Sequence, residues 1–135
     1  MSMPAQGERL PEQRVGPFGA AAVAAYARAS GDNNPIHVDA ALASEVGFEA
    51  PPVHGMRLMA AIEPALANWR PDLRIARLAG TFATPLLAGE EATISGRVLK
   101  SDEAGAFLRV TIQGPRRGPC LVAEAQLAPR IASAI

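Results

Sequence analysis

The chain has 135 residues, of which 49% are hydrophobic and 19% are charged, a composition that suits one folded domain with a packed core and excludes a disordered protein. Lys and Arg together number 13, and so do Asp and Glu, so the formal net charge is zero. This balance gives no electrostatic reason to expect nucleic acid or an anionic membrane surface as a partner.

The N-terminal part of the chain is predicted to contain an arm, a short strand and a helix. Residues 1–12 are polar and carry two prolines, so we expect an arm, followed by one domain at 13–130 and a tail at 131–135. RVGPFG is a candidate for a short edge strand, and the alanine-rich residues 20–30 favour a helix that Gly31 ends. No apolar run resembles a signal peptide or a membrane span, so we expect a cytoplasmic protein.

Two further helices are predicted in the middle of the chain. Asp39 is a typical N-cap for the segment AALASEV, and Gly47 is placed to end that helix. Another helix is expected to begin in HGMRLMAAI. Pro64 should kink or restart that helix, because proline has no backbone N–H to donate.

The second half of the chain is predicted to form strands. Its four segments are separated by turn signals: RIARLAGTFATPLLAG, EEATISGRVLKSD, GAFLRVTIQGP and GPCLVAEAQLAP. We expect them to form an antiparallel meander. The single cysteine, Cys120, lies in the last segment and is expected to be a core residue rather than a nucleophile. One helix on such a sheet would leave a sheet edge exposed, so we expect a homodimer.

Both histidines lie in SGDNNPIHVDAALASEVGFEAPPVHGM, residues 30–56. Asp32 precedes His37 by five residues, a spacing that would put the two side chains about 140° apart on a helix. Pro35 disfavours helical geometry, and the side chain of Asn34 can tie the loop to itself. The loop can therefore bring a carboxylate and an imidazole to the same water molecule.

This segment resembles the hydratase motif of the MaoC-like dehydratases, the R-specific enoyl-CoA hydratase group of the hot-dog fold. GDNNPIHVD supplies the Asp, Asn, Pro, His and Asp of the motif, and GFEAPPVHGM supplies its Gly-Phe, proline and His-Gly-Met. FATPLLAGEEATISGRVL is similar to a later passage of the family, so the resemblance extends over most of residues 14–128. It implies an α+β hot-dog fold, in which an antiparallel sheet wraps around a central helix, extra short helices carry the motif, and chains pair into dimers.

The resemblance also implies a function in fatty acid metabolism. Such enzymes hydrate trans-2-enoyl thioesters to (R)-3-hydroxyacyl thioesters, and catalyse the reverse dehydration, without a metal or redox cofactor. The thioester carrier is coenzyme A or acyl carrier protein. By the motif, Asp32 and His37 take the places of the catalytic pair, and Gly55 that of the residue whose N–H holds the thioester oxygen. We interpret Asp32 as the base and His37 as its orienting partner and proton shuttle, while the group that protonates C2 stays open.

Further residues of the motif are candidates for substrate binding. His54 is expected to brace the Gly55 turn by hydrogen bonding, and the apolar candidates are expected to be core residues that can also line an acyl pocket. Arg57 stands where the family commonly has an apolar residue, so it points to solvent, to an acid on a second subunit, or to an anionic group of the substrate. The substrate-binding candidates are Asn34, Phe48, His54, Met56, Arg57 and Met59.

Two alternatives to hydration stay open. A thioesterase of the same fold would also need a carboxylate and a helix N-terminus, but the Asp32–His37 pair favours hydration because it offers two groups to a water molecule. A non-catalytic acyl-thioester-binding subunit, such as one half of a heterodimer, is disfavoured by the intact pair. The sequence leaves the acyl-chain length and the direction of the reaction open.

Overall fold

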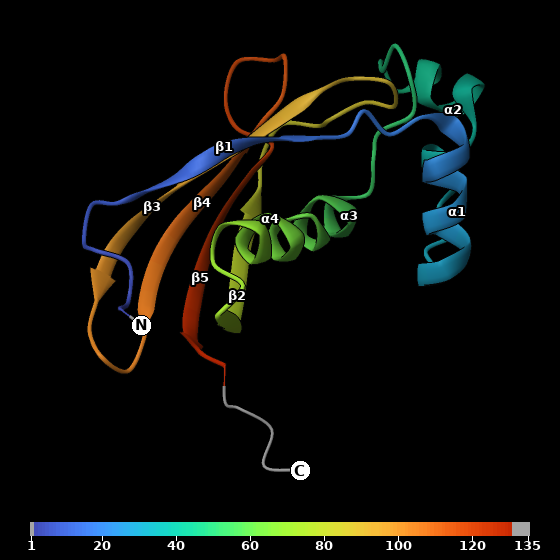
Figure 1. Cartoon of the computed structure of the whole chain (residues 1–135). Coiled ribbons are helices and arrows are strands. Elements are labelled where there is room, and N and C mark those ends of the chain that lie inside the picture. Colours follow the sequence, from blue (N-terminus) through green and yellow to red (C-terminus); the bar gives the residue numbers. More distant parts are fainter. Residues whose placement is uncertain (1, 131–135) are drawn as a thin grey trace.

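The computed structural model describes residues 2–130 and shows a curved antiparallel sheet with a helical segment against its inner face (Figure 1). The elements are β1 (Arg9–Val15), α1 (Ala20–Ser30), η1 (Pro35–His37), α2 (Ala40–Glu45), α3 (Gly55–Ala60), α4 (Ile62–Trp69), β2 (Leu73–Phe82), β3 (Ala92–Ser101), β4 (Ala106–Gln113) and β5 (Leu121–Pro129). The short helices η1 and α2 lie with α1 at one end of the sheet (Figure 1). This is the α+β hot-dog architecture that the sequence predicted.

The core lies between the sheet and the helical segment. Every second side chain of β4 and β5 is buried, as expected for strands with one face on a core: Ala106, Leu108, Val110, Ile112, Leu121, Ala123, Ala125 and Leu127. Leu58 of α3 and Ile62 of α4 are buried in the same cluster. Each such Leu or Ile contributes roughly 1.5–3 kcal/mol by leaving water. Cys120 is only 1% exposed and belongs to this cluster, which confirms its expected place in the core.

The order of the strands differs from a simple meander of four. The sheet runs β1-β3-β4-β5-β2, so only β3, β4 and β5 follow one another. β2 pairs with β5, from Leu73 opposite Pro129 to Phe82 opposite Leu121. The connection from β2 to β3 therefore crosses to the far side of the sheet, where β3 pairs with β1. Alternation along the sequence identifies strands but does not state which strands are neighbours.

The first strand begins earlier than expected. β1 starts at Arg9, within the stretch 1–12 that was predicted to be an arm, and it pairs with β3. Its buried residues are Leu10 and Val15, and an irregularity lies between Leu10 and Gln13. Because this irregularity breaks the two-residue alternation, the start of the strand could not be recognised from its sequence, and the predicted strand in RVGPFG overlaps only its end.

The predicted helix ends are confirmed. α1 ends at Gly31, which adopts the left-handed conformation with φ of 76°. The Asp39 side chain caps α2 by accepting hydrogen bonds from two backbone N–H groups, at 3.0 and 3.1 Å. The central helix is interrupted at Ala61, between α3 and α4, because Pro64 cannot donate a hydrogen bond to the carbonyl of Ala60.

None of the helices within residues 2–130 is long and apolar enough to cross a membrane. The expected cytoplasmic location stays a prediction. The predicted tail at 131–135 lies outside the described residues.

Candidate active site

The loop between α1 and η1 is shaped by hydrogen bonds from side chains to its own backbone. The hydroxyl of Ser30 accepts from the N–H of Asp32 at 3.2 Å, and the carboxylate of Asp32 accepts from the N–H of Asn34 at 3.3 Å. The amide oxygen of Asn34 accepts from the N–H of Ile36 at 3.2 Å and so caps η1. Asn34 therefore ties the loop to itself, as its sequence predicted.

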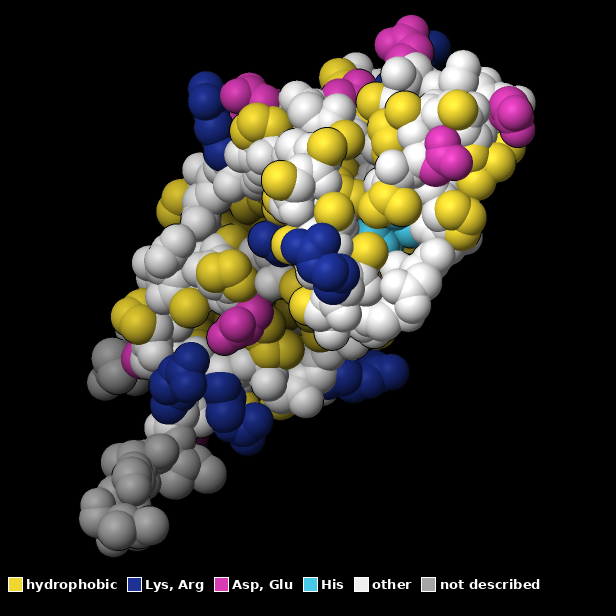
Figure 2. All heavy atoms as spheres, turned by 90° about the vertical axis from the view of Figure 1, so that its right-hand side faces the viewer, with side chains coloured by type: hydrophobic (Ala, Val, Ile, Leu, Met, Phe, Trp, Pro, Cys, Tyr) yellow, Lys and Arg dark blue, Asp and Glu magenta, His cyan; other side chains and the backbone are white. Residues whose placement is uncertain are grey.

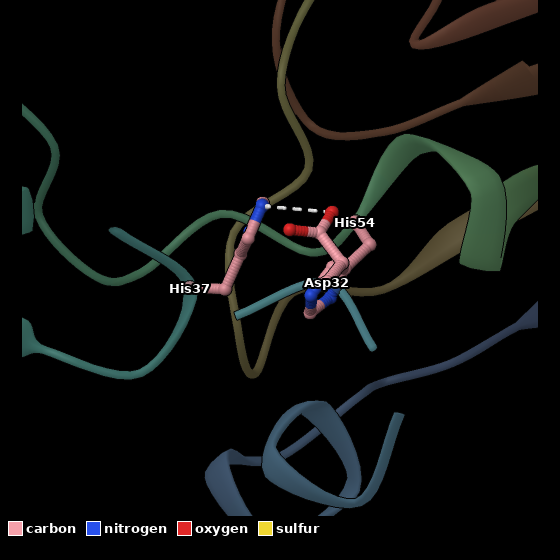
Figure 3. A group of neighbouring side chains, drawn as sticks. All are labelled: Asp32, His37 and His54. Carbon is pink, nitrogen blue, oxygen red and sulfur yellow. Dashed lines mark ion pairs between the residues drawn. The ribbon is translucent and has the colours of Figure 1, made fainter. Parts of the chain in front are cut away.

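This loop and η1 bring Asp32 and His37 together. Nδ1 of His37 lies 2.7 Å from the carbonyl oxygen of Pro52. A carbonyl only accepts, so the proton of the neutral imidazole is on Nδ1 and Nε2 is left as an acceptor. Nε2 lies 4.0 Å from Oδ2 of Asp32 (Figure 3). That distance is too long for a direct hydrogen bond and short enough for one water molecule to contact both atoms.

His54 is placed differently from what the sequence suggested. It is 2% exposed, and neither of its ring nitrogens has a hydrogen-bond partner within residues 2–130, so the expected hydrogen-bonded brace of its side chain is wrong. Its ring instead stacks on His37, with centroids 3.7 Å apart and planes inclined by 22°. On the α1 side it contacts the ring of Tyr26 at 4.9 Å. The main chain of His54 does hold the turn, because its carbonyl accepts from the N–H groups of Arg57 and Leu58.

The pKa of His54 is lowered, first by burial and then by the nearby His37, while the carbonyl and carboxylate of Asp32 act in the opposite direction. Burial disfavours the charged imidazolium, and two imidazolium rings in contact would repel each other. The charged form of His54 is therefore disfavoured in the stacked pair.

Asp32, His37 and His54 also carry the kinds of group that bind metal ions. One donor atom from each lies within 4.8 Å of the others. The lone pair of an imidazole nitrogen lies in the plane of its ring, and the two ring planes are nearly parallel. One ion cannot lie in both planes at a normal Zn–N distance of about 2.0–2.1 Å, so the set fits a metal poorly.

An open cleft of about 490 Å³ adjoins Asp32, and its lining residues are Tyr26, Ser30, Asp32, His54, Gly55, Met56 and Phe82. His37 is not among them and lies behind His54, on which it stacks. Figure 2 shows histidine atoms (cyan) only as a small recessed area beside hydrophobic side chains. A Cβ atom at Gly55 would lie 3.0 Å from carbon atoms of the Phe82 ring, so glycine leaves room for the ring beside the start of α3. Asp32 and Gly55 therefore line the same cleft.

The other predicted substrate-binding residues fall into different places. Met56 is 58% exposed and lines the cleft, so its expected place in the core is wrong. Met59 is partly buried and packs against the core. Phe48 is half-buried and is not among the residues that line the cleft. The Arg57 guanidinium lies over the ring of Phe18, 4.6 Å from its centroid, also away from the cleft lining, so a contact with the carrier stays a prediction.

Two aromatic residues of the cleft were not predicted from the sequence. Tyr26 comes from α1 and Phe82 from the end of β2. Tyr26 follows the buried Val23 by three residues on α1, a spacing that is typical of an ordinary core contact. Phe82 is 44% exposed, although it lies in a segment rich in apolar residues. Only the tertiary structure places both rings on the same cleft as Gly55.

Comparisons with known proteins show the family and the fold of this chain. The sequence profile of a family described as MaoC like domain matches residues 5–112. The chain is 39% identical over 103 residues to an (R)-specific enoyl-CoA hydratase of Aeromonas caviae, covering 72% of this chain and 77% of that protein. The structure of an (R)-hydratase from A. caviae, titled as involved in PHA biosynthesis, superposes with a TM-score of 0.84 at 30% identity, covering 94% of this chain and 98% of that one. An unliganded R-hydratase from Pseudomonas aeruginosa shares the fold, with a TM-score of 0.82 at 22% identity and coverage of 98% and 90%.

Proposed function

The chain belongs to the family of MaoC-like domains, and we propose on this premise that it is a hydratase that interconverts trans-2-enoyl thioesters and (R)-3-hydroxyacyl thioesters. The relative named (R)-specific enoyl-CoA hydratase matches most of the chain. The observation that carries the proposal is the 4.0 Å separation between Nε2 of His37 and Oδ2 of Asp32.

The pair can hold and activate the water molecule that adds to the double bond. A water has two protons, and the carboxylate of Asp32 and the free Nε2 of His37 offer one acceptor for each. As the oxygen of the water bonds to C3, one of these acceptors takes its proton, and the electrons of the C2–C3 double bond move towards the thioester oxygen. General bases of this kind contribute typically about 10²–10⁴-fold in rate. C2 then takes a proton, and the reverse sequence gives dehydration.

The Gly55 N–H is proposed to hold the thioester oxygen while it carries negative charge. Gly55 is the first residue of α3, and among residues 2–130 no acceptor is found for its N–H. It lines the same cleft as Asp32, so a thioester there can face both. Backbone donors aimed at an oxyanion contribute about 3–4 kcal/mol in other enzymes.

We infer that two copies of the chain form a homodimer. β2 is an edge strand, and its residues from Ala79 to Phe82 are exposed. The exposed Phe82 and Met56 lie next to the cleft, at 44% and 58% exposure. A second copy would cover this edge and these apolar side chains, which otherwise are a liability for aggregation.

The reaction is proposed to need neither a metal nor a redox cofactor. Hydration of a double bond changes no overall oxidation state, and the stacking of His37 on His54 directs their nitrogens poorly for a shared ion. Activity is expected to survive treatment with a chelator.

The proposal is tested by mixing the purified protein with crotonyl-CoA and following both the absorbance of the conjugated enoyl thioester and the release of free thiol. A hydratase removes the enoyl absorbance, releases no thiol and gives the (R)-3-hydroxy product. Thiol release would indicate a thioesterase, and binding without turnover would indicate a non-catalytic subunit. Repeating the assay over several chain lengths, and with acyl carrier protein thioesters, defines the substrate.

A further inference from the structure

His54 is the one polar or charged side chain that is buried within residues 2–130. Its two ring nitrogens have no hydrogen-bond partner among these residues. Burying an imidazole without partners costs folding free energy, and an apolar residue in its place would avoid that cost. Buried polar groups without hydrogen-bond partners are rare in proteins, so we expect His54 to have a role beyond packing.

The surroundings of His54 indicate what that role is. One face of its ring lies against His37 of η1, at 3.7 Å between centroids, and Tyr26 of α1 contacts it at 4.9 Å. Its carbonyl is bonded to the N–H groups of Arg57 and Leu58 in α3. The main chain of His54 is therefore held by α3 and its ring is packed against two other rings, whereas the ring of His37 has a single hydrogen bond, to Pro52.

One hydrogen bond does not fix an imidazole ring. A ring bonded only through Nδ1 can still tilt about that bond, and a tilt would move Nε2 away from Asp32. A flat ring stacked at 3.7 Å removes this freedom, because a tilt would bring the two rings into steric overlap. Figure 3 shows His54 next to Asp32 and His37, with the dashed line joining the latter two.

To support His37, the ring of His54 must also stay uncharged. As a proton shuttle, His37 carries positive charge while it holds an extra proton, and a charged neighbour at stacking distance would oppose that charge. The titratable groups that face His54 are His37 from η1, Asp32 from the loop after α1, and Tyr26 from α1. Of the two imidazoles, His54 is the more deeply buried, so positive charge on its ring is the more strongly disfavoured.

We propose that His54 is a positioning residue for His37, whose flat, neutral ring holds the His37 imidazole with Nδ1 on the Pro52 carbonyl and Nε2 towards Asp32. This inference rests on the proposed hydratase function. In this role His54 acts through the shape and neutrality of its ring, and not through a hydrogen bond to the substrate. Phenylalanine has a flat, neutral ring without nitrogen, so His54→Phe should preserve the positioning of His37.

The test compares His54→Phe, which keeps a flat ring, with His54→Leu, which does not. Turnover of crotonyl-CoA by His54→Phe is expected within about threefold of the original protein, and kcat of His54→Leu is expected to fall by about tenfold or more with KM little changed. Nitrogen NMR gives a second readout. The chain has two histidines, so every imidazole signal of an untagged His54→Phe protein belongs to His37.

The expected NMR result for His54→Phe is a neutral His37 protonated at Nδ1. A fall in kcat of more than about 30-fold for His54→Phe, or a His37 protonated mainly at Nε2, would overturn the proposal, as would full activity of His54→Leu. Should His54→Leu not fold, the phenylalanine variant still decides. The NMR readout needs no turnover. An original protein without hydratase activity would therefore contradict the proposed function, and the His37 tautomer would still test the positioning role of His54.

Discussion

Nε2 of His37 lies 4.0 Å from Oδ2 of Asp32, and the proton of the neutral His37 ring is on the opposite nitrogen, bonded to Pro52. Two acceptors therefore face a gap that one water molecule can span. The side chain of His37 is 14% exposed and that of Asp32 is 51% exposed, so solvent can reach this gap from the Asp32 side. The predictions below test this arrangement and its supports.

Removing the imidazole should disable water activation. His37→Ala is expected to lower kcat for crotonyl-CoA by at least about 10²-fold, because one of the two acceptors for the water is lost. Circular dichroism should show an unchanged fold, since the His37 side chain donates only one hydrogen bond to the main chain. A rate near that of the original protein would remove His37 from the mechanism.

Gly55 should tolerate no larger residue while Phe82 stays in place. A Cβ atom at Gly55 would lie 3.0 Å from the Phe82 ring, so Gly55→Ala must displace either the ring or the amide that faces the cleft. We expect Gly55→Ala to reduce kcat/KM by about 10-fold or more, and Phe82→Leu in the same chain to restore part of it. Additive effects of the two changes, measured as a double-mutant cycle, would contradict a steric coupling.

Much of the fold could be predicted from the sequence because its signals are local. The cap at Asp39, the left-handed Gly31 and the helix break before Pro64 each depend on a few neighbouring residues. The strand order could not be predicted, because the pairing of β2 with β5 depends on contacts between distant segments. The ion pair between Arg116 and Glu90, at 2.5 Å, likewise joins residues that are 26 positions apart.

The site was predictable where the motif itself carries the geometry. Pro35 and Asn34 indicated a bent loop, and the loop brings Asp32 and His37 together. The role of the His54 side chain could not be read in this way, because a histidine in a sequence predicts a hydrogen bond more readily than a stacked ring. Its stacking depends on how η1 and α1 bring His37 and Tyr26 to the residue that precedes α3.

The open edge of β2 predicts self-association. Light scattering at micromolar concentration should give twice the mass of one chain. Ala79→Asp is expected to weaken the dimer, because it adds a charge to the exposed part of β2. Asp substituted for the exposed Ala25 of α1 is a matched control and should leave the dimer intact. A monomeric original protein would contradict the prediction.

His54 should make stability depend on pH in a defined direction. Burial holds the pKa of His54 below its ordinary value of 6.5, so below that pH the unfolded chain binds a proton that the folded protein does not. Stability is therefore expected to fall as the pH drops from 6.5 towards the folded-state pKa, and to be unaffected by this group above 6.5. Thermal unfolding followed from about pH 7 to about pH 5 should show a smaller loss for His54→Phe than for the original protein. Parallel curves for the two proteins would show that His54 does not carry the effect.

The most direct measurement is the turnover of crotonyl-CoA by Asp32→Asn. The change keeps the size of a half-exposed side chain and replaces a carboxylate oxygen with an amide, which cannot take a proton from water. The account predicts a fall in kcat of at least about 10²-fold, with the melting temperature almost unchanged. A rate within about threefold of the original protein would show that the carboxylate is not the base, and would contradict the proposed mechanism.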